Sequence, residues 1–137
     1  MRTHIIFFTF LVCLICTTAN AQETVTIHKE YDYITRYEAM EAMGLYLGQS
    51  ANCSPEGTIT HEKNRVQAWL EKTCQTKKEV QDLFSAFISG AKDGININTL
   101  AITNGVAEGK SMDQIKEEIA KSCAKAKAQY QLIILAP

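Results

Sequence analysis

The 137-residue sequence lacks the residue groupings on which most cofactor chemistry depends. It contains no Gly-x-Gly-x-x-Gly or Walker-type run, so no phosphate-binding loop is expected. The segment that begins at His61 starts like a zinc-protease helix, but Arg65 occupies the position of the second histidine ligand. We therefore expect no metal site and no organic cofactor.

A second long apolar run is also missing, and the first one is typical of a secretory signal peptide. Arg2 precedes an apolar stretch of about a dozen residues, and Ala19-Asn20-Ala21 is a small-x-small cleavage motif. The stretch is shorter than the roughly 20 residues that cross a bilayer. We expect residues 1–21 to be removed, leaving residues 22–137 as a single helical domain without a membrane span, in the periplasm or secreted.

The sequence also lacks the residue placement that a cysteine nucleophile or a two-carboxylate glycosidase requires. A cysteine nucleophile needs a histidine to take its proton, and the expected mature chain offers only His28 and His61, both in segments expected to be exposed. Glu38 and Glu41 are three residues apart on one expected helix, whereas a glycosidase needs its carboxylates on opposite sides of a cleft. We expect no catalytic residues and predict that the chain is not an enzyme.

The charge changes sign along the expected mature chain. Residues 22–62 contain seven acidic and two basic residues, whereas residues 63–137 contain eleven basic and eight acidic residues. The two parts can neutralise each other within one small bundle or present opposite charges to partners. Net acidity, export and the lack of aromatic residues among the lysines argue against a nucleic-acid partner.

Capping residues and apolar periodicity predict an all-α bundle of about five helices. Thr35, Thr76 and Ser111 are each followed three residues later by Glu or Gln, which is typical of a helix start. Apolar residues at helical spacing then give each helix a buried face. In the first helix this face contains Tyr37, Met40, Gly44 and Leu47. The expected helices cover residues 36–50, 60–74, 77–92, 98–106 and 112–130.

The two ends of the chain and two glycines carry different signals. Residues 24–28 alternate as a strand does, and residues 131–135 include a short apolar run that fits either a strand or a last helical turn. If both are strands, they can pair and hold the termini together. Gly94 is expected to end the third helix, and the missing side chain of Gly90 lets another backbone approach.

The expected mature chain contains three cysteines, Cys53, Cys74 and Cys123. In an oxidising compartment this odd number predicts one disulfide and one further thiol, which is either free and buried or paired between two chains in a homodimer. Cys74 and Cys123 both lie in register with apolar stripes, so a bridge between them is natural, and Cys53 is the alternative partner for either. All three pairings remain open. A bridge closing about 50 residues would stabilise the fold by roughly 4 kcal/mol.

One short segment resembles a known class of proteins. Residues Phe84 to Gly94 are similar to a segment of the helical periplasmic immunity proteins of bacterial secretion systems. The resemblance covers these eleven residues, and the paired-cysteine framework of those proteins does not match the present sequence.

The absence of catalytic groupings beside well-formed core stripes favours a small exported, disulfide-containing binding or inhibitory protein of effector, inhibitor or immunity type. It would act on another protein in the envelope or outside the cell. The alternative is an accessory structural subunit of a bacterial envelope secretion or conjugation apparatus, because opposite charges in the two parts suit head-to-tail contacts. Local charge places the expected partner surface on the first helix and the following loop, at Glu38, Glu41, Gln49 and Glu56.

Overall fold

Four helices account for most of residues 23–136, which are the residues that the computed structural model describes. The predicted signal sequence and the final residue lie outside the described residues. In chain order the elements are β1 (Val25–Ile27), α1 (Tyr33–Gln49), the 3-10 turn η1 (Ala51–Cys53), α2 (Thr58–Thr73), α3 (Lys77–Ala107), α4 (Met112–Gln131) and β2 (Ile133–Leu135). The predicted all-α architecture is confirmed, with four helices instead of about five.

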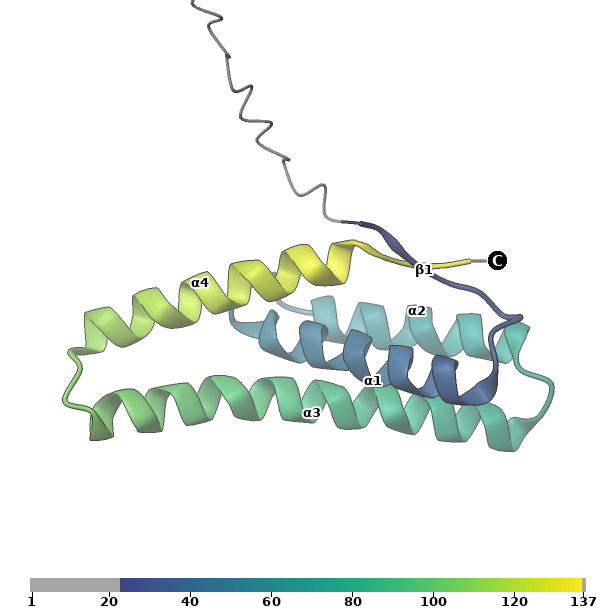
Figure 1. The fold of residues 1–137 in the computed structure, drawn as a ribbon, viewed down its shortest axis with the longest axis horizontal. Coiled ribbons are helices and arrows are strands. Elements are labelled where there is room, and N and C mark those ends of the chain that lie inside the picture. The colour runs from purple at the N-terminus through teal and green to yellow at the C-terminus, as the bar shows by residue number, and fades with distance from the viewer. Residues whose placement is uncertain (1–22, 137) are drawn as a thin grey trace, which may run out of the picture.

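The longest helix, α3, organises the other three. It has 31 residues and is therefore about 46 Å long. Figure 1 shows α1 and α2 beside the first part of α3, while α4 returns above it toward the strands. The core lies where α1, α2 and α3 meet, and its largest fully buried side chains include Phe87, Met40, Met43, Leu47 and Leu70.

Capping side chains begin three of the helices. The Thr76 hydroxyl accepts from the Glu79 amide at 3.1 Å, and Ser111 and Gln114 form the predicted reciprocal capping box. The expected start at Thr35 is wrong. Asp32 accepts from the Thr35 amide at 3.0 Å and also from the Thr35 hydroxyl, so α1 begins at Tyr33.

The predicted break near Gly94 is also wrong, because the expected helices over residues 77–92 and 98–106 are one continuous helix. A Cβ atom at Gly94 would lie 2.6 Å from the Gln49 amide nitrogen of α1. The glycine therefore serves a close helix approach and not a helix end. The chain leaves α3 at Gly109, whose positive φ of 74° favours glycine.

The backbones of α1 and α3 touch through two pairs of glycines, Gly44 and Gly48 on α1 and Gly90 and Gly94 on α3. A Cβ atom at Gly90 would collide with the Glu41 carbonyl oxygen and lie 2.9 Å from the Leu45 amide nitrogen. The expectation that another backbone approaches Gly90 is confirmed. Such an approach leaves no room for a side chain on either helix, and it holds α1 rigidly against α3.

The two ends of the described chain form a small parallel sheet. Val25 pairs with Ile133 and Ile27 with Leu135, so the strand interpretation of residues 133–135 is confirmed. Ile27 is fully buried, and the indole nitrogen of Trp69 donates to the Ala136 carbonyl oxygen. The strands therefore close the bundle over α2.

The disulfide joins Cys53 to Cys123, with 6.0 Å between their Cα atoms. The bridge between Cys74 and Cys123 that the apolar registers favoured does not form. Cys74 follows α2 at the turn into α3, whereas Cys123 lies within α4 beside η1. The spacing of apolar residues indicates which face of a helix is buried. It does not indicate whether two residues on the buried faces of different helices lie at the same position along the bundle axis.

Candidate protein-binding surface

The first two turns of α1 expose three large side chains next to two carboxylates. Ile34 is 67% exposed and Tyr37 is 38% exposed, and the ring centroids of Tyr33 and Tyr37 are 6.1 Å apart. Together with Glu38 and Glu41 these residues line a surface hollow of about 400 Å³. We call this set, Tyr33, Ile34, Tyr37, Glu38 and Glu41, the α1 patch.

Helical periodicity places the α1 patch on the outer face of α1. The opposite face is buried and contains Arg36, Met40, Met43, Gly44 and Leu47. Tyr37 was expected on that buried face, and this expectation is wrong because Arg36 points inward in its place. The sequence does not show that Arg36 is buried. Without that knowledge, the exposure of Ile34 and Tyr37 could not be predicted.

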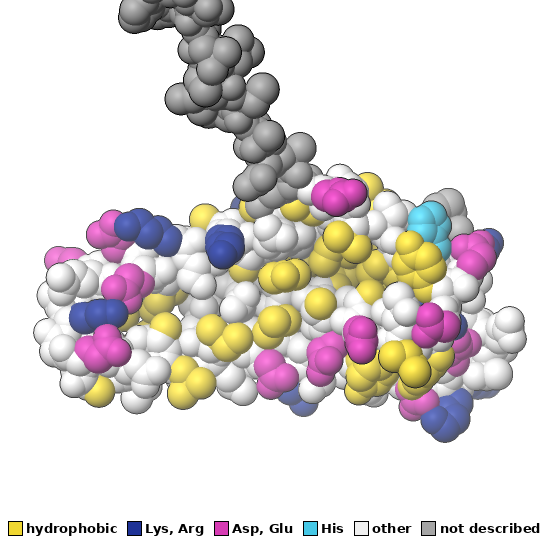
Figure 2. Space-filling view, in the orientation of Figure 1, with side chains coloured by type: hydrophobic (Ala, Val, Ile, Leu, Met, Phe, Trp, Pro, Cys, Tyr) yellow, Lys and Arg dark blue, Asp and Glu magenta, His cyan; other side chains and the backbone are white. Residues whose placement is uncertain are grey.

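Carboxylates lie along the side of the patch that faces α3. A neighbouring hollow is lined by Glu38, Glu41 and Asp93 of α3, and no lysine or arginine lines it. Figure 2 shows acidic and hydrophobic side chains intermingled over the half of the face that α1 occupies. Partial desolvation and the nearby Asp82 carboxylate raise the pKa of Tyr33, and Lys78 offsets part of that effect.

The four acidic and polar residues that the sequence indicated do not form one surface. Glu38 and Glu41 are exposed and lie together. Gln49 lies at the other end of α1, where it lines a different hollow with Lys125 and Gln129 of α4. Glu56 is exposed in the loop between η1 and α2, beyond that same end. The candidate site therefore keeps Glu38 and Glu41 and gains the three large side chains beside them.

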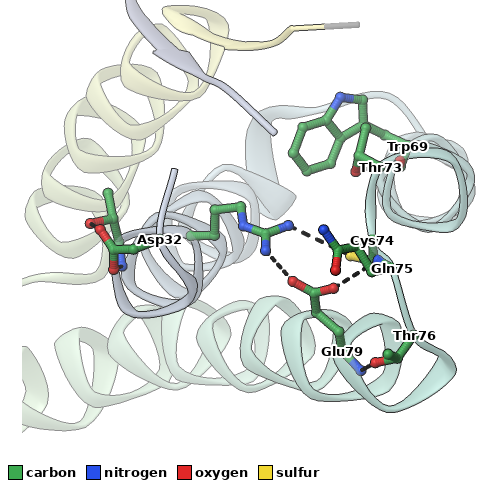
Figure 3. Close-up of polar contacts among 9 residues, drawn as sticks. Asp32, Trp69, Thr73, Cys74, Gln75, Thr76 and Glu79 are labelled. Carbon is green, nitrogen blue, oxygen red and sulfur yellow. Dashed lines mark hydrogen bonds and ion pairs between the residues drawn. The ribbon is translucent and has the colours of Figure 1, made fainter. Parts of the chain in front are cut away.

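A buried ion pair fixes the start of α1. Arg36 is only 7% exposed, and its guanidinium pairs with Glu79 of α3. Glu79 also accepts from the Gln75 amide at 2.9 Å, and Arg36 Nη1 lies 3.9 Å from Cys74 Sγ. The dashed lines in Figure 3 trace this cluster at the turn between α2 and α3. A buried charge of this kind needs its partner, so the pair holds the α1 patch in place.

The free thiol in this cluster is not activated. Burial and the Glu79 carboxylate raise the pKa of Cys74, and Arg36 offsets only part of that effect. Among the described residues neither histidine hydrogen-bonds to Cys74: His61 contacts Glu62, and the His28 ring lies against Tyr31. A protonated thiol without a base beside it fits a structural role.

A second polar cluster explains the residue that interrupts the zinc-protease pattern. Arg65 Nε donates to Glu62 at 2.7 Å, and the Tyr130 hydroxyl of α4 donates to the same carboxylate oxygen. Burial acts to raise the pKa of Glu62, but hydrogen bonds from Tyr130 and Arg65 lower it overall. Burial and Glu62 raise the pKa of Tyr130. This cluster ties α2 to α4.

Neither a metal-binding cluster nor a membrane-spanning helix is present between residues 23 and 136. This part of the chain holds no group of three or more His, Cys, Asp or Glu side chains arranged to bind a metal ion. Its helices are too short or too polar to cross a membrane. Comparisons with protein-family models, with curated proteins and with solved structures found no match.

Proposed function

We propose that this chain is a small exported binding or inhibitory protein that acts on another protein in the envelope or outside the cell through its α1 patch. The observation that supports this proposal is the exposure of Tyr33, Ile34 and Tyr37 beside Glu38 and Glu41. The disulfide is compatible with an oxidising compartment.

The composition of the patch suits protein recognition. Tyrosine is enriched among the residues that dominate interface energetics, because it buries a large area and keeps a hydrogen-bonding hydroxyl. The surrounding carboxylates favour a partner that presents lysine or arginine side chains. Acidic side chains at the rim mainly raise the association rate, while the aromatic residues contribute to the lifetime of the complex.

The rigidity of α1 also favours binding. The helix lies against α3 through backbone contacts at Gly44 and Gly90, and the Arg36–Glu79 pair holds its first turn. A surface held in this way loses little conformational freedom when a partner binds. The α1 patch is thus prepared for a contact without rearrangement.

The experiment is affinity capture from an extract of the source organism, followed by calorimetry with the partner so identified. Tyr37→Ala should weaken binding about 10-fold or more, because it removes a central aromatic contact. The double variant Glu38→Lys with Glu41→Lys should also weaken binding, and the loss of affinity should be larger at low salt than at high salt. Unchanged affinity in both variants would contradict the proposal.

Glu56→Lys is the matched control for the charge reversals. It changes the charge of an exposed acid beyond the other end of α1, so affinity should stay within about twofold of the unmodified protein. If Glu56→Lys weakened binding as much as the α1 reversals, the contact surface would have to extend to the loop.

A second candidate is an accessory structural subunit of an envelope assembly. It is favoured by exposed lysines on α4, such as Lys116 and Lys125, which differ in charge from the acidic α1 patch. Head-to-tail contacts between such surfaces would form open oligomers. Light scattering at low salt would then show a mass that grows with concentration, and added salt would reverse it.

A further inference from the structure

The last part of α3 extends beyond α1 and α2. The side-chain amide of Asn98 donates to the carbonyl oxygen of Gln49, the last residue of α1, at 3.0 Å. Figure 1 shows that only α4 accompanies α3 past this point. One neighbouring helix covers less of a helix surface than the two, α1 and α2, that lie beside the first part of α3.

A row of side chains at a spacing of four, three and four residues is left uncovered there. Ile95, Ile102 and Val106 are between 40% and 58% exposed. Thr99, between them, donates its hydroxyl to the Ile95 carbonyl oxygen at 3.3 Å. This spacing is the one by which a helix pairs with another helix. We call these four residues the α3 seam.

The seam carries no polar group that would oppose burial. The Thr99 hydroxyl already has a partner in its own helix, so the side chain can be covered without losing a hydrogen bond. Residues 94–107 contain no Asp, Glu, Lys, Arg or His. A helical surface of this length that is exposed and wholly uncharged is unusual for a protein in water.

Helix α4 packs on a different face of α3. Ile115 is fully buried against Gly105, where a Cβ atom would lie 2.7 Å from Ile115 Cγ1. Lys110 pairs with Glu108 and Glu118 and closes the turn between the two helices. Helix α4 therefore covers the side of α3 that contains Gly105 and leaves the α3 seam exposed to solvent.

We propose that two copies of this protein pair seam to seam through the last part of α3. The lack of charge favours a second copy, because two neutral seams meet without repulsion and a charged partner surface would lose hydration for no ion pair. A two-fold axis makes the contact self-complementary. Antiparallel pairing keeps the thicker ends, formed by α1 and α2, apart.

The expected contact is small and the dimer correspondingly weak. Three half-exposed aliphatic side chains per copy provide less apolar surface than the roughly 800 Å² per partner of a standard interface. We expect a dissociation constant on the order of 10 to 100 μM. Burial of neutral side chains predicts little dependence on salt, in contrast to head-to-tail contacts between charged surfaces.

The experiment is analytical ultracentrifugation of the protein without its predicted signal sequence, over about 5 to 500 μM. A Cys74→Ser background removes the free thiol and with it a covalent dimer. The mass should rise from one copy to two, equally at low and high salt. Ile102→Glu and Val106→Glu should each weaken dimerisation at least 10-fold, because a buried carboxylate lacks a partner.

Ile34→Glu is the matched control, since it places the same charge on an exposed isoleucine of the α1 patch and should dimerise as the parent does. Ile102→Glu and Ile102→Lys, each monomeric alone, should dimerise when mixed, which a damaged fold would not permit. Circular dichroism checks that each variant remains helical. A parent that stays monomeric, seam variants that dimerise normally, a mixture that stays monomeric, or growth beyond two copies would overturn the proposal.

Discussion

The two parts of α3 show how differently one helix can be used. In its first part Gly90 lies against the α1 backbone and Phe87 is completely buried. In its last part Ile102 and Val106 face solvent although they are equally apolar. The helical pattern is the same throughout. What differs is the number of neighbouring helices, so burial in this protein depends on where α1 ends.

The two surfaces proposed for binding lie beside different parts of α3. The α1 patch lies where α1, α2 and α3 pack around the core, while the α3 seam lies on the hairpin of α3 and α4 that projects beyond them (Figure 1). Seam-to-seam pairing would leave both α1 patches free at opposite ends of the dimer. Two patches on one dimer would strengthen binding to a partner that offers two sites.

The largest expected effect comes from removing the disulfide that ties α4 of the α3–α4 hairpin to η1, just beyond the end of α1. Replacing Cys53 and Cys123 by serine frees a loop whose ends are 70 residues apart, which should reduce the free energy of unfolding by about 4 kcal/mol. Urea denaturation measures this loss. Cys74→Ser is the control, and it should change little because the serine hydroxyl can accept from Arg36 in place of the thiol. An unchanged midpoint in the double variant would mean that the bridge does not support the fold.

The next effect tests the close contact in the first part of α3. Gly90→Ala should destabilise the protein by about 3 kcal/mol, because the new methyl group meets backbone atoms of Glu41 and Leu45 that cannot move independently. Gly105→Ala is the matched variant in the last part, where the new methyl group meets the Ile115 side chain instead. It should cost about 1 kcal/mol or less, because a side chain can shift and alanine favours the helix.

The smallest effect concerns the cluster that ties α2 to α4. Because the pKa of Glu62 is lower in the folded state than in the unfolded chain, its stabilising effect is complete above the unfolded pKa of about 4.3. That effect is lost as the pH falls below this value and through the folded pKa. Tyr130→Phe should cost about 1 kcal/mol at pH 7 by removing one hydrogen bond.

Urea midpoints between about pH 3 and 6 check the pH dependence. Glu62→Gln should flatten the decline in stability at acid pH, because the glutamine side chain does not titrate. Glu71→Gln, on the exposed surface of the same helix, should leave the decline as it is in the parent. Equal curves for the Glu62 variant and the parent would remove Glu62 from the explanation.

Local signals in the sequence predicted local structure well. Thr76 and Ser111 begin α3 and α4 as expected, and the choice of Asp32 over Thr35 moves one boundary by a single helical turn or less. The same signals failed at Gly94, since a glycine that ends a helix and a glycine that admits a neighbouring backbone look alike in one sequence. Of the four residues expected on the partner surface, Glu38 and Glu41 lie together and Gln49 and Glu56 lie elsewhere.

The sequence by itself determined the helical class, most helix starts, the apolar faces and the odd number of cysteines in the expected mature chain. These properties follow from interactions within a few residues, such as a capping hydroxyl or a side chain one turn away. The tertiary structure alone decided that Cys53 pairs with Cys123, that Arg36 is buried in place of Tyr37, and that the end of α3 stays uncovered. The disulfide pairing and the uncovered end of α3 depend on how far one helix reaches along another, and the burial of Arg36 depends on its partner Glu79 on α3. The spacing of apolar residues within one helix contains no information about either.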